Sequence, residues 1–185
     1  MNNTAGVGKL HPISVPTPFA IGEVWVFLWK GDPLTLIDTG AKTPGDYEAL
    51  CAGLREHGVT PGDLQRIIVT HHHLDHVGLL HDLMEASGAF SCGHPDLVLQ
   101  RHLAYAYDEE HRRYYMATML ELGVPPEVLD QIMPTWGIFK ELVADFTLSH
   151  ALPDGGRADP FVAYHVPGHS ATDILLVNSE EGYAV

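Results

Sequence analysis

Residues 70–76, with the sequence Thr-His-His-His-Leu-Asp-His, constrain this chain more than any other stretch. They follow a continuous apolar run at 67–69, typical of a buried strand, and precede a segment at 77–80 that is typical of a helix start. Imidazole rings and a carboxylate packed this densely gain little from burial unless another group compensates for the lost water. A divalent metal supplies that compensation, because imidazole and carboxylate groups are ligands of zinc and related ions.

The spacing within this stretch assigns a direction to each side chain. In an extended segment, side chains at positions i and i+2 point the same way, so His71 and His73 are expected to converge on one ion. Asp75 and His76 follow where the chain turns into the helix, and are expected to face a second ion or the water bound to the first. His72 is expected to point away from the ion and not to bind it. Polar loop histidines or a tag remnant are the alternatives, but the run is internal and its alternation is what a shared ion requires.

The same stretch, extended to residue 78, resembles the H-x-H-x-D-H signature of the metallo-β-lactamase superfamily. Leu-Ile-Asp-Thr-Gly at 36–40 resembles the early strand-end aspartate motif of that family, and Val-Pro-Gly-His-Ser at 166–170 resembles its P-G-H motif. Three motifs in this order make the resemblance specific. It implies an α/β (α+β) fold, the αββα sandwich of the superfamily.

The resemblance also implies a role for each polar residue of the motifs. His169, which alone would be undecided, becomes the expected third ligand of the first ion, beside His71 and His73. Asp75 is expected to ligate a second ion with His76, to orient the nucleophile and to carry its proton to the leaving group. Asp38 is expected to support the metal-binding loop without touching metal, because ligands need partners that orient them; an ordinary turn carboxylate is the alternative.

Composition limits the class of protein. A chain of 185 residues with 45% hydrophobic content predicts one domain over 1–185 with a sizeable core. Ten basic against 24 acidic residues give a net charge of −14, which argues against a nucleic-acid groove. No stretch has the length of a membrane span or a signal sequence, so no membrane association and a cytoplasmic location are expected. Cys51 and Cys92 are expected to be free buried thiols.

Short apolar strands and amphipathic helices alternate between the motifs, an α/β pattern. The unbroken apolar run at 67–69 predicts the centre of a sheet with layers on both sides. Strands are expected at 9–15, 24–29, 34–38, 66–70, 89–92, 161–166, 173–178 and 183–185, and helices at 43–58 and 77–87.

Residues 94–146 change character and are predicted to form a helical insertion within the domain, with helices near 95–107, 109–122 and 125–133. The insertion is either a small subdomain with its own core or a cap whose aromatic and methionine side chains shape a substrate pocket. His94, His102 and His111 are expected to be surface or capping residues.

Members of the family continue from a strand such as 183–185 into a Gly-Asp pair whose carboxylate bridges two metals, and later supply one more histidine. In this sequence no histidine follows His169, and the one later aspartate, Asp173, comes too early to match. We therefore expect the sandwich to be truncated in its second half, as the amino-terminal portion of a longer protein. His71, His73 and His169 can still form a three-ligand site with an open position.

The resemblance implies a metal-dependent hydrolase with a small-molecule substrate. Zinc is the expected cofactor, as one or two ions, with iron or manganese as alternatives. The metal lowers the pKa of bound water from about 16 to about 7, and the resulting hydroxide attacks an ester, thioester or lactone carbonyl. A glyoxalase-II-like thioesterase or lactonase fits best.

Two alternatives to that enzyme are open. One is a catalytically incomplete, metal-binding fragment that self-associates as a homo-oligomer through uncovered strand edges. The other is an iron redox member of the superfamily, ranked last because those usually carry glutamate where His73 stands.

Overall fold

The apolar strands pair into a first sheet of six strands, in the order β1-β2-β3-β4-β5-β6. The computed structural model describes residues 10–99, 109–132 and 140–185. Strands β1 to β3 pair antiparallel, whereas β3 to β6 pair parallel and therefore need crossover connections. The strands are β1 (Leu10–Val15), β2 (Val24–Trp29), β3 (Thr35–Ile37), β4 (Arg66–Ile68), β5 (Phe90–Gly93) and β6 (His150–Ala151).

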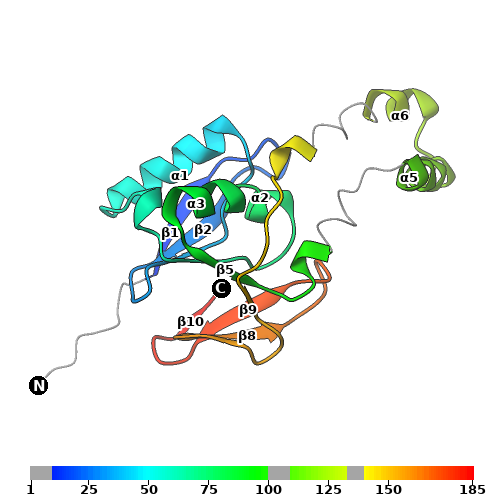
Figure 1. Ribbon diagram of the computed structural model, residues 1–185. Coiled ribbons are helices and arrows are strands. Elements are labelled where there is room, and N and C mark those ends of the chain that lie inside the picture. The colour runs from blue at the N-terminus through cyan, green and yellow to red at the C-terminus, as the bar shows by residue number, and fades with distance from the viewer. Residues whose placement is uncertain (1–9, 100–108, 133–139) are drawn as a thin grey trace, which may run out of the picture.

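Helices in these crossovers cover one face of the first sheet (Figure 1). Helix α1 (Pro44–Glu56) begins as the sequence predicts, since the Thr43 side chain accepts a hydrogen bond from Asp46 N–H and Pro44 opens the first turn. Between β4 and β5 the chain forms α2 (Leu74–Val77) and α3 (Leu80–Ser87). The 3-10 helices η1 (Pro61–Asp63) and η3 (Lys140–Leu142) are short connectors.

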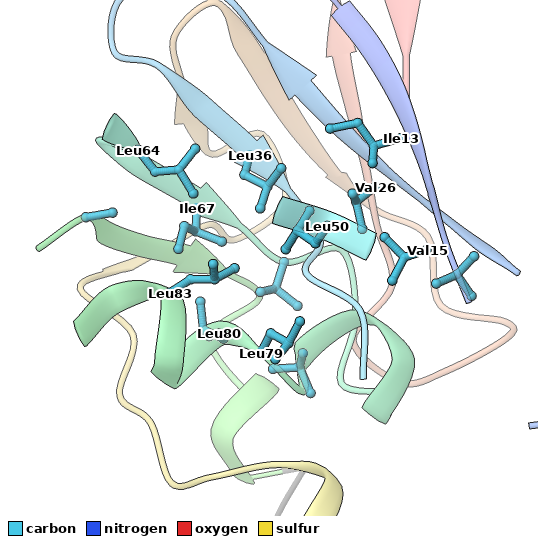
Figure 2. Packing of buried hydrophobic residues seen from close by; sticks show 14 of the residues in the cluster. Ile13, Val15, Val26, Leu36, Leu50, Leu64, Ile67, Leu79, Leu80 and Leu83 are labelled. Carbon is cyan, nitrogen blue, oxygen red and sulfur yellow. The ribbon is translucent and has the colours of Figure 1, made fainter. Parts of the chain in front are cut away.

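A hydrophobic core fills the space between these helices and the first sheet. Figure 2 shows Leu50 of α1 and Leu80 and Leu83 of α3 packed toward Val26 and Ile67 of the sheet, all of them buried. Each such aliphatic side chain stabilises the fold by about 1.5–3 kcal/mol when fully buried, more than a typical single hydrogen bond. This core therefore fixes where the ends of β3 and β4 lie, and the candidate site is built on those ends.

A second sheet lies against the other face of the first, in the order β10-β9-β8-β7 and antiparallel throughout. Its strands are β7 (Arg157–Ala158), β8 (Phe161–His165), β9 (Ile174–Asn178) and β10 (Tyr183–Ala184). Phe161 and Leu176 point inward and pack with Trp29, Ile37 and Ile68 of the first sheet in a second core. Helices, first sheet and second sheet are three successive layers of the predicted αββα sandwich.

Three details differ from the sequence-based expectation. The helix predicted after the histidine stretch is broken into α2 and α3 at Gly78, which lies so close to the backbone of Ala41 and Lys42 that an added Cβ would fall 2.7 Å from Ala41 Cα and 2.5 Å from Lys42 N. Strand β4 ends at Ile68, two residues early, so the histidine stretch begins in a loop. The two-residue strands β6 and β7 were not predicted.

Part of the predicted insertion is described. Helices α5 (Glu109–Glu121) and α6 (Pro126–Ile132) pack against each other and lie to one side of the two sheets (Figure 1). The helix expected at 95–107 falls mostly outside the described residues, as do the side chains of His102 and His111. The cap over the site and the single-domain organisation both stay predictions. None of the helices in the described ranges is long and apolar enough to cross a bilayer.

Candidate metal site

The site lies where the carboxyl ends of β3 and β4 meet the loop between β8 and β9. Because the two strands are parallel neighbours, the residues that follow them emerge at one edge, and Asp38 N–H donates to Ile68 O at 2.8 Å. The second sheet joins at the same point, where Ile174 N–H donates to Thr70 O at 3.0 Å. The sequence motifs at 36–40, 70–76 and 166–170 are thereby brought together.

Three histidines converge at this edge. Ligand atoms of His71, His73 and His169 all lie within 4.8 Å of one another. The ring centroids are separated by 4.7 Å between His71 and His73, 5.0 Å between His71 and His169 and 4.5 Å between His73 and His169. His71 is buried, His73 is half-buried and His169 is exposed, so the group opens toward solvent on one side. These are the three residues that the sequence assigned to the first ion.

The protonation and hydrogen bonding of His71 fit a metal ligand. Burial, with the charges of His76 and His73 in the same direction and that of Asp38 opposing, lowers the pKa of His71 to about 3, so the ring is neutral. Its Nε2 atom is buried and has no hydrogen-bond partner among the described residues. Leaving a buried polar atom unpaired costs roughly 1–3 kcal/mol, which coordination would remove. Burial, and then the charge of His169, likewise lower the pKa of His73. Three imidazoles are a donor set that zinc accepts.

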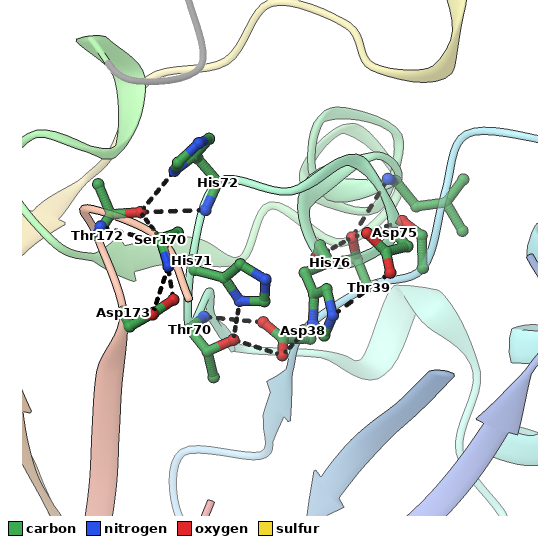
Figure 3. Close-up of polar contacts among 12 residues, drawn as sticks. Asp38, Thr39, Thr70, His71, His72, Asp75, His76, Ser170, Thr172 and Asp173 are labelled. Carbon is green, nitrogen blue, oxygen red and sulfur yellow. Dashed lines mark hydrogen bonds and ion pairs between the residues drawn. The ribbon is translucent and has the colours of Figure 1, made fainter. Parts of the chain in front are cut away.

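The Asp38 carboxylate supports the histidine stretch through hydrogen bonds. Its carboxylate Oδ1 accepts from Thr70 N–H at 2.8 Å, and Oδ2 accepts from the Thr70 hydroxyl at 2.7 Å and from His76 Nδ1 at 2.8 Å (Figure 3). The Thr70 hydroxyl gives its proton to Asp38, so at 3.0 Å it accepts from His71 Nδ1. One carboxylate thus keeps a proton on Nδ1 of both rings, directly for His76 and through the Thr70 hydroxyl for His71, whose Nε2 has no partner among the described residues.

The backbone of Asp38 is itself unusual. Its φ is 61°, in the left-handed region that aspartate tolerates better than most residues, and the residue is only 3% exposed. Such conformations persist where the surrounding contacts determine them and are frequent at functional sites.

Asp75 and His76 form a second polar pair beside the three histidines. Asp75 Oδ2 lies 3.6 Å from His76 Nε2, and the His76 ring lies 4.1 Å from that of His71 between centroids. Burial favours the neutral His76 ring, but the charge and hydrogen bond of Asp38 and the charge of Asp75 outweigh it, so the pKa of His76 is raised. Within the described ranges, the group whose ligand atoms all lie within 4.8 Å contains neither Asp75 nor His76. Both therefore lie near the predicted first ion without joining its ligand group.

Sequence reasoning missed the side chains that hold the His169 loop. His72 points away from His71 and lies outside the group of three histidines, as expected, although its ring is 5.1 Å from that of His73 between centroids. Its ring is buried, with Nδ1 2.9 Å from Thr172 Oγ1 (Figure 3). Asp173 accepts from the Ser170 N–H and hydroxyl, both at 2.7 Å. No local signal pairs residue 72 with residue 172, because the two lie on loops far apart in the sequence. Only the family motif brings those loops together.

His94, expected as a surface or capping residue, has a capping contact, since its Nδ1 accepts from Asp96 N–H at 3.2 Å, but it is not at the surface. It is buried at the end of β5, and its ring lies 4.2 Å from that of His165 between centroids. Burial, and then the charge of His165, lower the pKa of His94. A cavity of about 400 Å³ adjoins the site on the side of β2 and β9, with Trp25, Phe27 and Leu175 among its apolar lining residues.

A two-sheet sandwich with converging imidazoles at its strand ends defines a metal-binding protein of the α/β class. The chain belongs to the metallo-beta-lactamase superfamily, since the family profile of that description matches residues 20–185. This confirms the resemblance seen in the motifs.

Individual relatives agree with this assignment. A Bacillus subtilis (strain 168) protein described as "Probable metallo-hydrolase YqjP" is 30% identical over 175 residues, which is 92% of this chain and 53% of that protein. "Metallo-beta-lactamase domain-containing protein 1" of Xenopus laevis is 30% identical over 152 residues, 82% of this chain and 46% of that protein. The chain therefore spans about half the length of the curated relatives that it matches.

Solved structures share the fold. The metallo-beta-lactamase family protein TTHA1429 of Thermus thermophilus is similar with a TM-score of 0.78 at 25% identity, over 96% of this chain and 58% of that one. A beta-lactamase domain protein of Burkholderia ambifaria gives a TM-score of 0.73 at 19% identity, over 96% of this chain and 53% of that one. The predicted α/β metallo-β-lactamase-like sandwich is confirmed.

Proposed function

We propose that this chain forms the metal-binding part of a metal-dependent hydrolase that cleaves an ester, thioester or lactone carbonyl in a small-molecule substrate. The observation that carries the proposal is the convergence of His71, His73 and His169, together with the unpartnered, buried Nε2 of a neutral His71. The hydrolase part is further supported by the description of the Bacillus subtilis relative as a metallo-hydrolase. The net charge of −14 favours a small molecule over nucleic acid.

Zinc is the proposed metal, as one or two ions, with iron or manganese as alternatives. A bound divalent metal supplies Lewis-acid chemistry, in that it lowers the pKa of coordinated water and polarises a carbonyl. His71, His73 and His169 would hold it. Asp38 orients His76 and, through Thr70, His71.

Asp75 is the proposed proton carrier of the reaction. Its buried carboxylate lies beside His76, with Oδ2 3.6 Å from His76 Nε2. In the proposed reaction it would take a proton from the attacking water and return it to the leaving group. The two free cysteines support a reducing compartment such as the cytoplasm.

Metal analysis combined with hydrolysis assays on a generic thioester, ester and lactone tests this function. We expect bound zinc and turnover in the wild-type chain, with both lost in His71→Ala and His169→Ala. His57→Ala, which removes a histidine paired with His11 outside the site, is the matched control and should keep both. One equivalent of zinc or none, without turnover, would reject the enzyme function for this chain.

A second candidate function is a self-associating metal-binding unit without turnover of its own. It is favoured by the apolar outer face of the second sheet, where Tyr164 is 45% and Leu175 is 37% exposed. Two equivalents of zinc with turnover would reject it.

A further inference from the structure

The loop at 166–173 carries His169, the exposed member of the three converging histidines. An exposed ligand on a loop must be ordered when it binds, and binding is stronger when that order exists beforehand. The contacts that hold the loop in place therefore decide how well His169 can serve the site.

Several of these contacts shape the loop itself. The Ser170 N–H and hydroxyl donate to Asp173, and His165 Nε2 donates to Ala171 O at 3.0 Å. None of these hydrogen bonds joins the loop to the turn that carries His71 and His73. The backbone hydrogen bond from Ile174 N–H to Thr70 O joins the end of the loop to the first residue of that turn.

Thr172 reaches the middle of that turn with its side chain. It is fully buried, and its hydroxyl oxygen accepts from His72 N–H at 3.2 Å. The hydroxyl has one proton to give, and the nearer acceptor is His72 Nδ1 at 2.9 Å rather than Ser170 Oγ at 3.4 Å. Two hydrogen bonds between the same pair of residues fix both the position and the direction of Thr172. Figure 3 shows the rings of His72 and His71 on opposite sides of the chain.

We propose that His72 is a positioning residue for the metal site, which through Thr172 holds the His169 loop against the turn that carries His71 and His73. His72 lies between the two histidines in sequence, and its ring points to the opposite side of the chain from His71. The turn that aims His71 and His73 at the ion therefore aims His72 at the loop of the third histidine. This inference rests on the proposed metal-binding function.

Cobalt(II) binding by the full chain tests the inference, with affinity measured by chelator competition and geometry by the visible absorption of the bound ion. Thr172→Val keeps the shape of the side chain and removes the hydroxyl. We expect it to weaken binding about 10–100-fold, the usual loss when a partner of a metal ligand is removed, and to change the absorption spectrum. Thr172→Ser keeps the hydroxyl and should bind cobalt with nearly wild-type affinity and spectrum.

The other side of the contact provides an independent pair of variants. His72→Phe should behave like Thr172→Val, whereas His72→Asn, whose amide oxygen can take the place of Nδ1, should restore most of the affinity. If the two residues act through one contact, the double variant His72→Phe/Thr172→Val should be no weaker than the weaker single variant. Should Thr172→Val fail to fold by circular dichroism, the His72 pair decides.

The outcomes separate this inference from the function on which it rests. A wild-type chain that binds no cobalt would reject the metal function and the inference with it. A wild-type chain that binds cobalt, with Thr172→Val and His72→Phe binding equally well and with the same spectrum, would reject the inference alone. With cobalt binding unchanged, a lower melting temperature of the metal-free variants would not rescue the inference. A contact that only stabilises the fold would also lower the melting temperature.

Discussion

At the scale of single residues, the candidate site depends most on the carboxylate of Asp38. Its two oxygens receive three hydrogen bonds, from the Thr70 backbone, the Thr70 hydroxyl and His76. An amide at this position has one acceptor oxygen and would turn its NH₂ group toward another donor. His76 Nδ1 would then lose its acceptor, and the Thr70 hydroxyl, which accepts from His71 Nδ1, would lose the carboxylate that orients it.

We therefore expect Asp38→Asn to lower zinc affinity about 10–100-fold, measured by competition with a chelating dye. Asparagine tolerates a φ of 61° about as well as aspartate, so the change tests the charge and the hydrogen bonds rather than the backbone. Asp63→Asn, on η1 outside the site, is the control and should leave zinc affinity unchanged. Equal affinity in Asp38→Asn and the wild type would show that the carboxylate does not support the site.

The Cys92 thiol gives a prediction that is independent of metal. Burial raises the pKa of Cys92 to about 11, with Arg66 opposing, so at pH 8 the thiolate is only about 0.1% of the total. In a Cys51→Ala chain, iodoacetamide at pH 8 should therefore modify Cys92 at least about 100-fold more slowly in the folded protein than in urea. The reciprocal Cys92→Ala chain keeps only the half-buried Cys51. When folded, it should react faster than the folded Cys51→Ala chain. Equal rates for Cys92 with and without urea would contradict its burial.

The convergence of three histidines could be predicted because its signal lies in short sequence motifs. Alternation within 70–76 and the motif around His169 were enough to identify the three converging rings. The contact between His72 and Thr172 could not be predicted, because it exists only once two loops from different sheets meet. Burial of His94 was missed for the same reason, since its partner His165 lies on the other sheet.

At the scale of elements, the break between α2 and α3 places the histidine stretch. Gly78 ends α2, where Leu79 N–H donates to Gly40 O at 3.2 Å and Thr39 N–H donates to His76 O at 2.9 Å. These bonds join the turn after β3 to the turn after β4. The close approach that they require leaves no room for a side chain at Gly78.

Gly78→Ala should therefore separate the two turns. We expect it to lower the free energy of unfolding by about 1–3 kcal/mol in urea denaturation, the range for overpacking, and to weaken zinc binding as well. Gly45→Ala is the matched control, because an added Cβ in the first turn of α1 meets only Thr43 Oγ1 at 3.9 Å. That variant should be as stable as the wild type or slightly more so. If Gly78→Ala is as stable as Gly45→Ala, the turns do not need this close approach.

Elements with a clear period could be predicted, and those defined by their neighbours could not. The cap at Thr43 and the apolar stripe predicted α1 nearly to the residue. Strands β6 and β7 have two residues each and no period of their own, so only their pairing with β5 and β8 makes them strands. The break at Gly78 was missed because its cause is the backbone of residues 41–42.

At the scale of the whole molecule, the histidine cluster lies on the boundary between the two sheets. His71 and His73 follow the carboxyl end of β4 in the first sheet, whereas His169 lies in the loop between β8 and β9 of the second sheet. The second hydrophobic core holds the two sheets together independently of any ion. A metal would therefore bind to residues that the fold has already brought together.

The outer face of the second sheet is an apolar surface that these layers leave exposed. Antiparallel sheets with one face in water usually carry polar residues at the outward positions. Here the outward positions of β8 and β9 are Val162, Tyr164, Leu175 and Val177, and they form the cross-strand pairs Val162–Val177 and Tyr164–Leu175. The net charge of −14 opposes association of copies through such a face. The balance between the two therefore depends on salt.

We expect the chain to self-associate through this face, with an average mass in sedimentation equilibrium that rises with protein concentration. Association should increase with salt, because screening weakens the repulsion between acidic surfaces while apolar contacts persist. Leu175→Lys should keep the chain monomeric at every salt concentration. Ser179→Lys makes the same charge change at an exposed polar position outside the four outward residues, and should associate like the wild type. A wild-type chain that is monomeric throughout would show that the apolar face is too small to overcome the charge, and association that is abolished equally by both lysines would show that charge, not this face, controls it.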